Sequence, residues 1–300
     1  MQRRAFLKLG GAGAALAGAA TAGCGGDDYD YAQMRGDLRH LNYDSRGNLV
    51  EWFPAENRVQ LLDANNRLQW QYTGQGTPLG SLNAPAGVAF LNQRIYVSDF
   101  GNSRVVVLDM QGRPQFAFAE AGQGDGQALF VHEPVAGPDG NLYFCDALNH
   151  RVQVFRPDGT WLRSIGRFGT DGFGLNYPES QAFDAQGNLH VADSGNGRVV
   201  VFNAAGQGVR TYGSLGTEPG QMLNPEGIAI DTYGYVYVAD KGQHLVQIYD
   251  RQGAFQERRP VFLPNGDYGV PGDMVWRPDG VLHVTCTRDA SEGLIPRQYL

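Results

Sequence analysis

Short apolar runs of five or six residues, separated by Gly, Asn and Asp, recur along the chain from about residue 38 onward. Apolar and polar positions alternate within many of these runs, as in YVYVAD and LVQIYD, and no stretch after residue 24 shows the period of a helix. Runs of this length bounded by turn residues predict antiparallel strands joined by tight turns. The pattern therefore predicts an all-β protein.

The runs belong to a repeat with a period of 47 residues. Aspartates mark this period, and all but the last are followed five residues later by Arg: Asp99, Arg104, Asp146, Arg151, Asp193, Arg198 and Asp240. A fixed period of this size indicates a repeat architecture in which each unit is one supersecondary element. Four runs per repeat predict four-stranded antiparallel blades, and six such units predict a six-bladed β-propeller. The blades are expected near residues 38–73, 80–118, 128–166, 175–213, 222–257 and 270–300.

The repeats resemble NHL repeats. The resemblance rests on PEGIAID at residues 225–231, YVYVAD at 235–240, NHRVQVF at 149–155 and the linker GSLGTEPGQ at 213–221. It covers almost all of residues 38–290 and implies the propeller fold. The family includes binding scaffolds, lyases that cleave peptidyl hydroxyglycines, and relatives among metal-dependent lactonases. The metal-binding histidines of those lyases have no clear counterpart here, which weakens the enzyme interpretation.

The first residues follow a different pattern. Three basic residues and no acidic one precede an Ala/Gly stretch that ends in TAGC, which is typical of an export signal with a small-residue cleavage site. Residues 3–8 resemble a twin-arginine signal, and TAGC resembles a bacterial lipobox. The other interpretations are a short membrane anchor, for which the apolar run is short and rich in Gly, or a chance match.

We therefore expect residues 1–23 to be a signal peptide and 24–35 to be a lipidated N-terminus with a closing strand. Residues 36–300 are expected to form the propeller. Residues 292–300 are long enough for a third strand of the sixth blade, so the strand-like residues 29–34 are expected to supply its outer strand. Lipidation at Cys24 predicts an exported protein anchored on the periplasmic or cell-surface side.

Charge narrows the range of partners. Without residues 1–23, the chain carries 21 basic and 31 acidic residues, a net charge of −10. An acidic surface without Lys/Arg clusters repels phosphate backbones, which argues against nucleic-acid binding. The protein is expected to be a monomer that contacts the membrane through its lipid anchor only. Cys145 and Cys286 lie in apolar runs and are expected to be buried free thiols.

The repeated Asp and Arg residues are interpreted as structural, because a catalytic residue is normally needed once. Function is instead sought where the repeats differ. The first strand of each blade lies nearest the axis, so polar residues at its start are expected to surround the channel mouth. These candidate ligand-binding residues are Arg39, His40, His132, Glu133, Glu179, Glu226 and Asp273.

Two interpretations of this ring remain open. In one, His132, Glu133 and Glu179 bind Ca, Mn or Zn for a metal-dependent lyase or lactonase-type hydrolase similar to hydroxyglycine amidating lyases. In the other, the strand starts are solvated, and the propeller is a scaffold that binds a protein, peptide or carbohydrate. We favour the scaffold, with no catalytic residue assigned and a divalent metal only under the enzyme alternative.

Overall fold

The computed structural model describes residues 40–262, 268–276, 278, 280 and 282–287. The helical elements among these residues are short 3-10 turns that follow the second strands of blades: η2 (Pro54–Glu56), η3 (Phe100–Asn102), η4 (Ala147–Asn149) and η5 (Ser194–Asn196). All other elements are strands, which confirms the all-β class. No helix in the described part of the chain is long and apolar enough to cross a membrane.

Five sheets have four antiparallel strands each, in sequence order. The first sheet consists of β1 (His40–Tyr43), β2 (Leu49–Phe53), β3 (Arg58–Leu62) and β4 (Leu68–Tyr72). The second consists of β5 (Pro85–Leu91), β6 (Arg94–Asp99), β7 (Arg104–Asp109) and β8 (Pro114–Phe118). The next three consist of β11 (Val131–Ala136), β12 (Leu142–Asp146), β13 (Arg151–Phe155), β14 (Trp161–Ile165); β15 (Pro178–Phe183), β16 (Leu189–Asp193), β17 (Arg198–Phe202), β18 (Gly208–Tyr212); and β19 (Pro225–Ile230), β20 (Val236–Asp240), β21 (Leu245–Tyr249), β22 (Phe255–Pro260).

The sixth sheet consists of two strands within the described residues, β23 (Val270–Trp276) and β24 (Leu282–Thr287). Residues 29–34 and 292–300, which are expected to complete this blade, lie outside the described residues. A short parallel pair that the sequence pattern did not predict, β9 (Glu120–Ala121) and β10 (Gln127–Ala128), lies in the connection between the second and third sheets. The propeller of four-stranded antiparallel blades is confirmed, and six complete blades remain a prediction.

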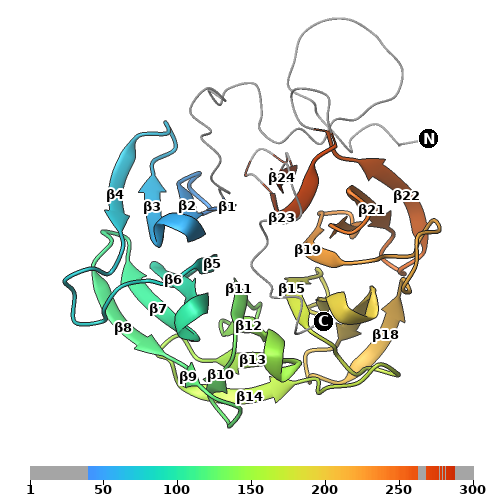
Figure 1. Ribbon diagram of the computed structural model, residues 1–300, viewed down its shortest axis with the longest axis horizontal. Coiled ribbons are helices and arrows are strands. Elements are labelled where there is room, and N and C mark those ends of the chain that lie inside the picture. The colour runs from blue at the N-terminus through green and yellow to red at the C-terminus, as the bar shows by residue number, and fades with distance from the viewer. Residues whose placement is uncertain (1–39, 263–267, 277, 279, 281, 288–300) are drawn as a thin grey trace, which may run out of the picture.

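The sheets are arranged in a ring around a central axis (Figure 1). The innermost strand of each sheet is its first: β1, β5, β11, β15, β19 and β23. Strand β1 contacts both β5 and β23, so the first and last sheets are neighbours and the ring closes. A closed ring leaves no long exposed sheet edge, which is how propellers avoid edge-to-edge association.

The core lies between neighbouring blades. Tyr96 and Val107 of the second blade, for example, belong to the same buried cluster as Phe144 and Phe155 of the third. Each large apolar side chain that is fully buried in this way stabilises the fold by about 1.5–3 kcal/mol. Since both faces of a blade need a neighbour, the ring and its blades stabilise each other.

The repeated Asp residues lie at the ends of the second strands, fully buried. Asp146 accepts hydrogen bonds from the backbone N–H of Leu129 at 2.7 Å and from Arg151 Nε at 2.8 Å. Asp99 and Asp193 contact Arg104 Nε and Arg198 Nε in the same way, at 2.7 and 2.8 Å. These contacts join each second strand to the linker that enters its blade.

Two blades replace this ion pair. Asp240 has no Arg partner and accepts a hydrogen bond from Gln243 Nε2 at 2.6 Å instead. In the first blade Phe53 occupies the Asp position, and the Arg58 guanidinium lies 3.8 Å from the centroid of its ring. A cation–π contact therefore stands where the second to fifth blades have a hydrogen-bonded carboxylate.

The two cysteines of the propeller differ. Cys145 in β12 is a fully buried free thiol, as expected, and burial raises its pKa well above the ordinary value. Cys286 in β24 is half-buried and packs against the apolar cluster of the last two blades, so it is less buried than expected.

Candidate functional site

Five of the six inner strands share an irregularity near their starts. In β11 the pairing with β12 shifts between His132 and Val135, and β5, β15, β19 and β23 shift at the corresponding place. A bulge removes residues from the hydrogen-bonded ladder and re-aims their side chains. Glu133, Glu179, Glu226 and Asp273 all lie within these irregular segments.

The inner strands also approach one another closely at this level. A Cβ on Gly87 would lie 2.7 Å from Glu133 Cα, and one on Gly227 would lie 2.3 Å from the carbonyl oxygen of Gly272. Glycine is needed at both positions because no real Cβ tolerates such contacts. We call this level of the channel, marked by Gly87, Glu133, Gly227 and Asp273, the neck.

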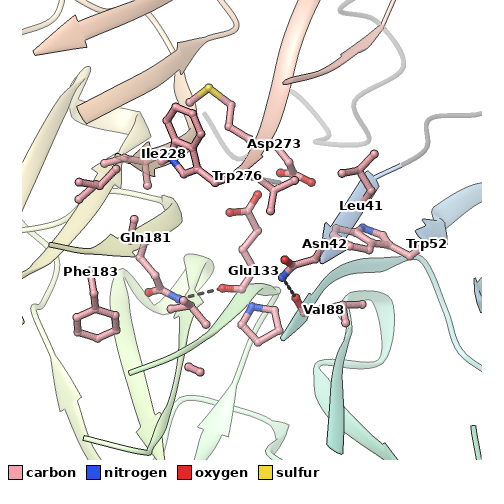
Figure 2. A pocket seen from close by; sticks show the side chains of 18 residues that line it. Leu41, Asn42, Trp52, Val88, Glu133, Gln181, Phe183, Ile228, Asp273 and Trp276 are labelled. Atoms are coloured by element: carbon pink, nitrogen blue, oxygen red, sulfur yellow. Dashed lines mark hydrogen bonds between the residues drawn. The ribbon is translucent and has the colours of Figure 1, made fainter. Parts of the chain in front are cut away.

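Two carboxyl groups meet at the neck. Glu133 extends from β11 toward Asp273 of β23 (Figure 2). Burial, reinforced by the charge of Asp273 and a hydrogen bond with it, raises the pKa of Glu133 well above its usual range. The backbone of Glu133 is strained, with φ of +29°, and its carbonyl accepts a hydrogen bond from Gln181 Nε2 at 3.0 Å. Two carboxyls in such contact resist ionising together.

An ion pair lies near the neck. Lys241 Nζ is 2.9 Å from Glu226 Oε2, and Glu179 beside them is 4% exposed. Burial and the charge of Glu226 raise the pKa of Glu179 well above the ordinary value, against the opposing effect of Lys241. Burial alone would lower the pKa of Lys241, but the carboxylates of Glu226 and Glu179 outweigh it and raise this pKa.

Sequence reasoning missed Lys241. It follows Asp240 directly, at a position where the other Asp-containing blades have Phe100, Ala147 and Ser194. Sequence reasoning compared corresponding positions of the repeats at the start of the first strand. The same comparison at the loop after the second strand would have identified Lys241.

Aromatic side chains flank this end of the channel. Phe100 stacks on Phe130 with ring centroids 4.4 Å apart and contacts the His132 ring at 4.8 Å, and His132 lies 6.4 Å from Tyr177. Tyr177 is 4% exposed, and its hydroxyl has no hydrogen-bond partner in the described part of the chain. Burial, with the nearby charges of Glu179 and Glu226, raises the pKa of this hydroxyl.

A cavity of about 360 Å³ extends from the neck along the later residues of the inner strands. Residues of β1, β5, β11, β15, β19 and β23 all line it (Figure 2). The walls are largely aliphatic, with Trp52, Phe183 and Trp276 as aromatic members, and Glu133 and Asp273 are the only charged residues among the 18 that line it. The channel therefore combines an apolar chamber with an acidic neck.

Comparisons with known proteins agree with this fold. A family model described as NHL repeat matches residues 82–108. The chain is 31% identical over 94 residues to the protein brain tumor of Drosophila melanogaster, a match that covers 30% of this chain and 9% of that protein. The chain thus spans less than a tenth of that relative. Repeat and fold together support an NHL-type β-propeller.

Solved structures resemble this propeller over most of its length. A streptogramin B lyase matches with a TM-score of 0.66 at 13% identity, over 86% of this chain and 79% of that one. A catalytically inactive virginiamycin B lyase from Staphylococcus aureus, solved with quinupristin, matches with a TM-score of 0.64 at 12% identity, over 84% and 79% of the two chains. Identities this low show a shared fold alone.

The predicted site residues that the structure describes differ in their immediate partners. Glu133 and Asp273 meet at the neck, Glu226 pairs with Lys241 near Glu179, and His132 lies among the aromatic side chains. Arg39 and the side chain of His40 lie outside the described residues. Within the described residues no three His, Cys, Asp or Glu side chains are grouped so that they could hold one metal ion, and this includes His132, Glu133 and Glu179.

Proposed function

We propose that this NHL-type propeller is an exported, lipid-anchored protein that binds a ligand in its central channel. The observation that carries the proposal is the axial cavity of about 360 Å³, lined by all six inner strands and ending at the Glu133–Asp273 pair. Its size falls within the range of about 300–1,000 Å³ that is typical of small-molecule sites. A small ligand, such as a peptide fragment or a sugar, fits this chamber better than a folded partner does.

The carboxyl groups at the neck support a functional interpretation because their arrangement is unfavourable for the stability of the fold. The repeated Asp residues satisfy the backbone of their linkers and an Arg or Gln side chain, which is a structural role. Glu133 and Asp273 instead place two acids in contact, one of them on strained backbone. Strain and perturbed carboxyl groups of this kind concentrate at functional sites.

Export and anchoring are proposed from residues 1–24. The basic start, the Ala/Gly stretch and the TAGC sequence support a twin-arginine lipoprotein signal that lipidates Cys24. Residues 29–34 and 292–300 are proposed to complete the sixth blade, so that the anchor and the ring closure lie close together in the sequence.

The metal-dependent lyase or hydrolase is the weaker candidate. Lyases share this fold, but the described side chains do not fit a metal centre: no three ligands converge, and Lys241 already neutralises Glu226. The chemistry of that alternative therefore has no site in the described part of the channel.

A channel-filling variant tests the proposal. Ala136 lines the cavity, so Ala136→Trp should occupy it, while Ala205→Trp in an exposed turn is the matched control. The purified proteins are screened by thermal unfolding against neutral, cationic and anionic fragments and against Ca²⁺, Mn²⁺ and Zn²⁺ salts. Binding in the channel predicts fragments that raise the Tm of the wild type and of Ala205→Trp but not that of Ala136→Trp.

Two results would change the conclusion. If no compound distinguishes the wild type from Ala136→Trp, the channel is not a ligand site. Stabilisation by one metal ion that is lost in both His132→Ala and Glu179→Ala would instead support the metal-dependent alternative.

A further inference from the structure

We propose that the axial cavity binds an uncharged aromatic molecule with about two rings. The inference rests on the proposed function of this cavity and names the chemical class of its ligand. Three observations carry it: the polar groups of the lining are engaged within the protein, the remaining walls are apolar and include fixed aromatic rings, and the volume exceeds that of a single ring.

The uncharged polar side chains of the lining already have hydrogen-bond partners. Asn42 Nδ2 donates to the carbonyl of Val88 at 2.8 Å, and Asn42 Oδ1 accepts from the next backbone N–H at 2.8 Å. Gln181 Nε2 donates to the carbonyl of Glu133 at 3.0 Å, and Gln181 Oε1 accepts from the Cys145 thiol at 3.4 Å. A ligand hydroxyl or amide would have to break such bonds to gain its own. The lining therefore favours a ligand with few polar groups over a sugar.

The two acids of the lining are engaged as well. Glu133 and Asp273 hydrogen-bond to each other, and burial favours the protonated form of Glu133. A bound cation would have to break into this contact. An anion would approach two acids, and no Lys, Arg or His is among the described residues that line the cavity. An uncharged molecule leaves the pair intact, and burying it has no charge-desolvation cost.

The remaining walls are apolar and include aromatic rings from three blades. Phe183 and Trp276 are half-buried, and Phe183 and Trp52 lie on opposite sides of the cavity (Figure 2). Tyr143 of β12 and Tyr237 of β20 support two of these rings by edge-to-face contacts, with centroids 4.9 Å from Phe183 and 5.3 Å from Trp276. Aromatic rings favour stacked or edge-to-face contact with one another, and rings that are already fixed lose little freedom on binding. An aromatic ligand therefore matches these walls.

The volume of the cavity sets the size of the ligand. An apolar cavity of about 150 Å³ accommodates one benzene molecule, so the cavity of about 360 Å³ has room for about two rings. The cavity reaches the last residues of four inner strands, which are Ala136, Phe183, Ile230 and Trp276. We therefore expect the ligand to enter from this end of the channel, away from the neck.

Titration calorimetry on the purified protein tests the inference with three probes that share one ring system. These are the uncharged 2-naphthylmethanol, the cation 2-naphthylmethylammonium and the anion 2-naphthoate. The uncharged probe should bind about tenfold more tightly, or better, than either ion, because only the ions lose the hydration of a charge. Phe183→Leu and Trp276→Leu keep the wall apolar but remove a ring, so each should weaken the uncharged probe by about threefold or more.

A buried charge provides the matched pair of variants. Ile230→Asp places a carboxyl group in the apolar wall and should weaken the uncharged probe by about tenfold or more. The control Val209→Asp introduces the same group at an exposed position of the outer strand β18 and should leave all three affinities unchanged.

The outcomes separate this inference from the proposed function. Equal or tighter binding of either ion by the wild type would overturn the inference while leaving a channel that binds charged ligands. Unchanged affinity in both ring variants would overturn the aromatic class. Absence of binding by all three probes would also overturn the inference, and the Ala136→Trp screen then decides the proposed function separately. If Ile230→Asp does not fold, the comparison of probes on the wild type still decides.

Discussion

The Asp at the end of each second strand should contribute more to stability than any exposed carboxylate of the protein. Asp146 is the best case, because its carboxylate is fully buried and accepts hydrogen bonds from Leu129 N–H, Asn149, Arg151 and Gln153. The substitution Asp146→Ala removes this acceptor and leaves the donors in place. The size of the loss can be derived from what each donor can still contact.

Two of the four donors keep another acceptor. Asn149 Nδ2 still contacts the carbonyl of Gly122 at 2.9 Å, and Gln153 Nε2 still contacts that of Gln127. Leu129 N–H and Arg151 Nε have no other acceptor among the described residues. A buried donor left unsatisfied costs about 1–3 kcal/mol, and breaking a buried ion pair costs about 3–5 kcal/mol. We expect Asp146→Ala to lower the free energy of unfolding by about 3–5 kcal/mol.

The control is Asp109→Ala. Asp109 also accepts from two backbone N–H groups and from an Arg, Arg113, but in an exposed hairpin turn where water can replace it. Its loss should cost about 1 kcal/mol or less. Urea unfolding followed by circular dichroism and tryptophan fluorescence measures both variants, provided that the two transitions coincide. A loss below about 1 kcal/mol for Asp146→Ala, or equal losses for the two variants, would refute the structural role of the repeated Asp.

Two further predictions concern the neck and the anchor. The pKa of Glu133 is raised in the folded state, so the folded protein holds this proton at pH values where the unfolded chain, with a pKa of 4.5, has lost it. The free energy of unfolding therefore falls as the pH rises from 4.5 toward the pKa of the folded state. Glu133→Gln should therefore raise the Tm, relative to the wild type, more at pH 8 than at pH 5. A variant whose Tm at pH 8 is below that of the wild type would contradict the buried carboxyl pair. Cys24→Ala should move the exported protein from the membrane fraction to the soluble fraction, and continued membrane retention would count against lipidation.

The sequence predicted the repeat correctly because its signals are local. Each blade is encoded by alternation over five or six residues, by turn glycines, and by an Asp and an Arg five positions apart that meet across one turn. Gly112, for example, has φ of +76° in the turn between β7 and β8, as its place in the pattern implied. Such interactions act within a few residues and recur with the same chemistry in each repeat.

The candidate site could be predicted only in part. Alignment of the repeats identified Glu133, Glu179, Glu226 and Asp273 as departures from the pattern, but it placed all of them at one mouth and missed Lys241. In the structure these acids influence one another's ionisation, with Glu133 beside Asp273 and Glu226 paired with Lys241. This arrangement depends on the bulges and on the close approach of neighbouring strands at Gly87 and Gly227, which no single repeat encodes.

The sequence by itself thus determined the class of fold, the blade as its unit and the hydrogen bonds within each blade, because these depend on contacts between residues close in the chain. Only the tertiary structure decided which acids face each other, what surrounds them and how large the chamber beside them is. Glu133 and Asp273 are 140 residues apart in sequence and meet because the ring closes around the axis. The raised pKa of Glu133 follows from its burial and from the charge of Asp273, which depend on distances in the folded protein.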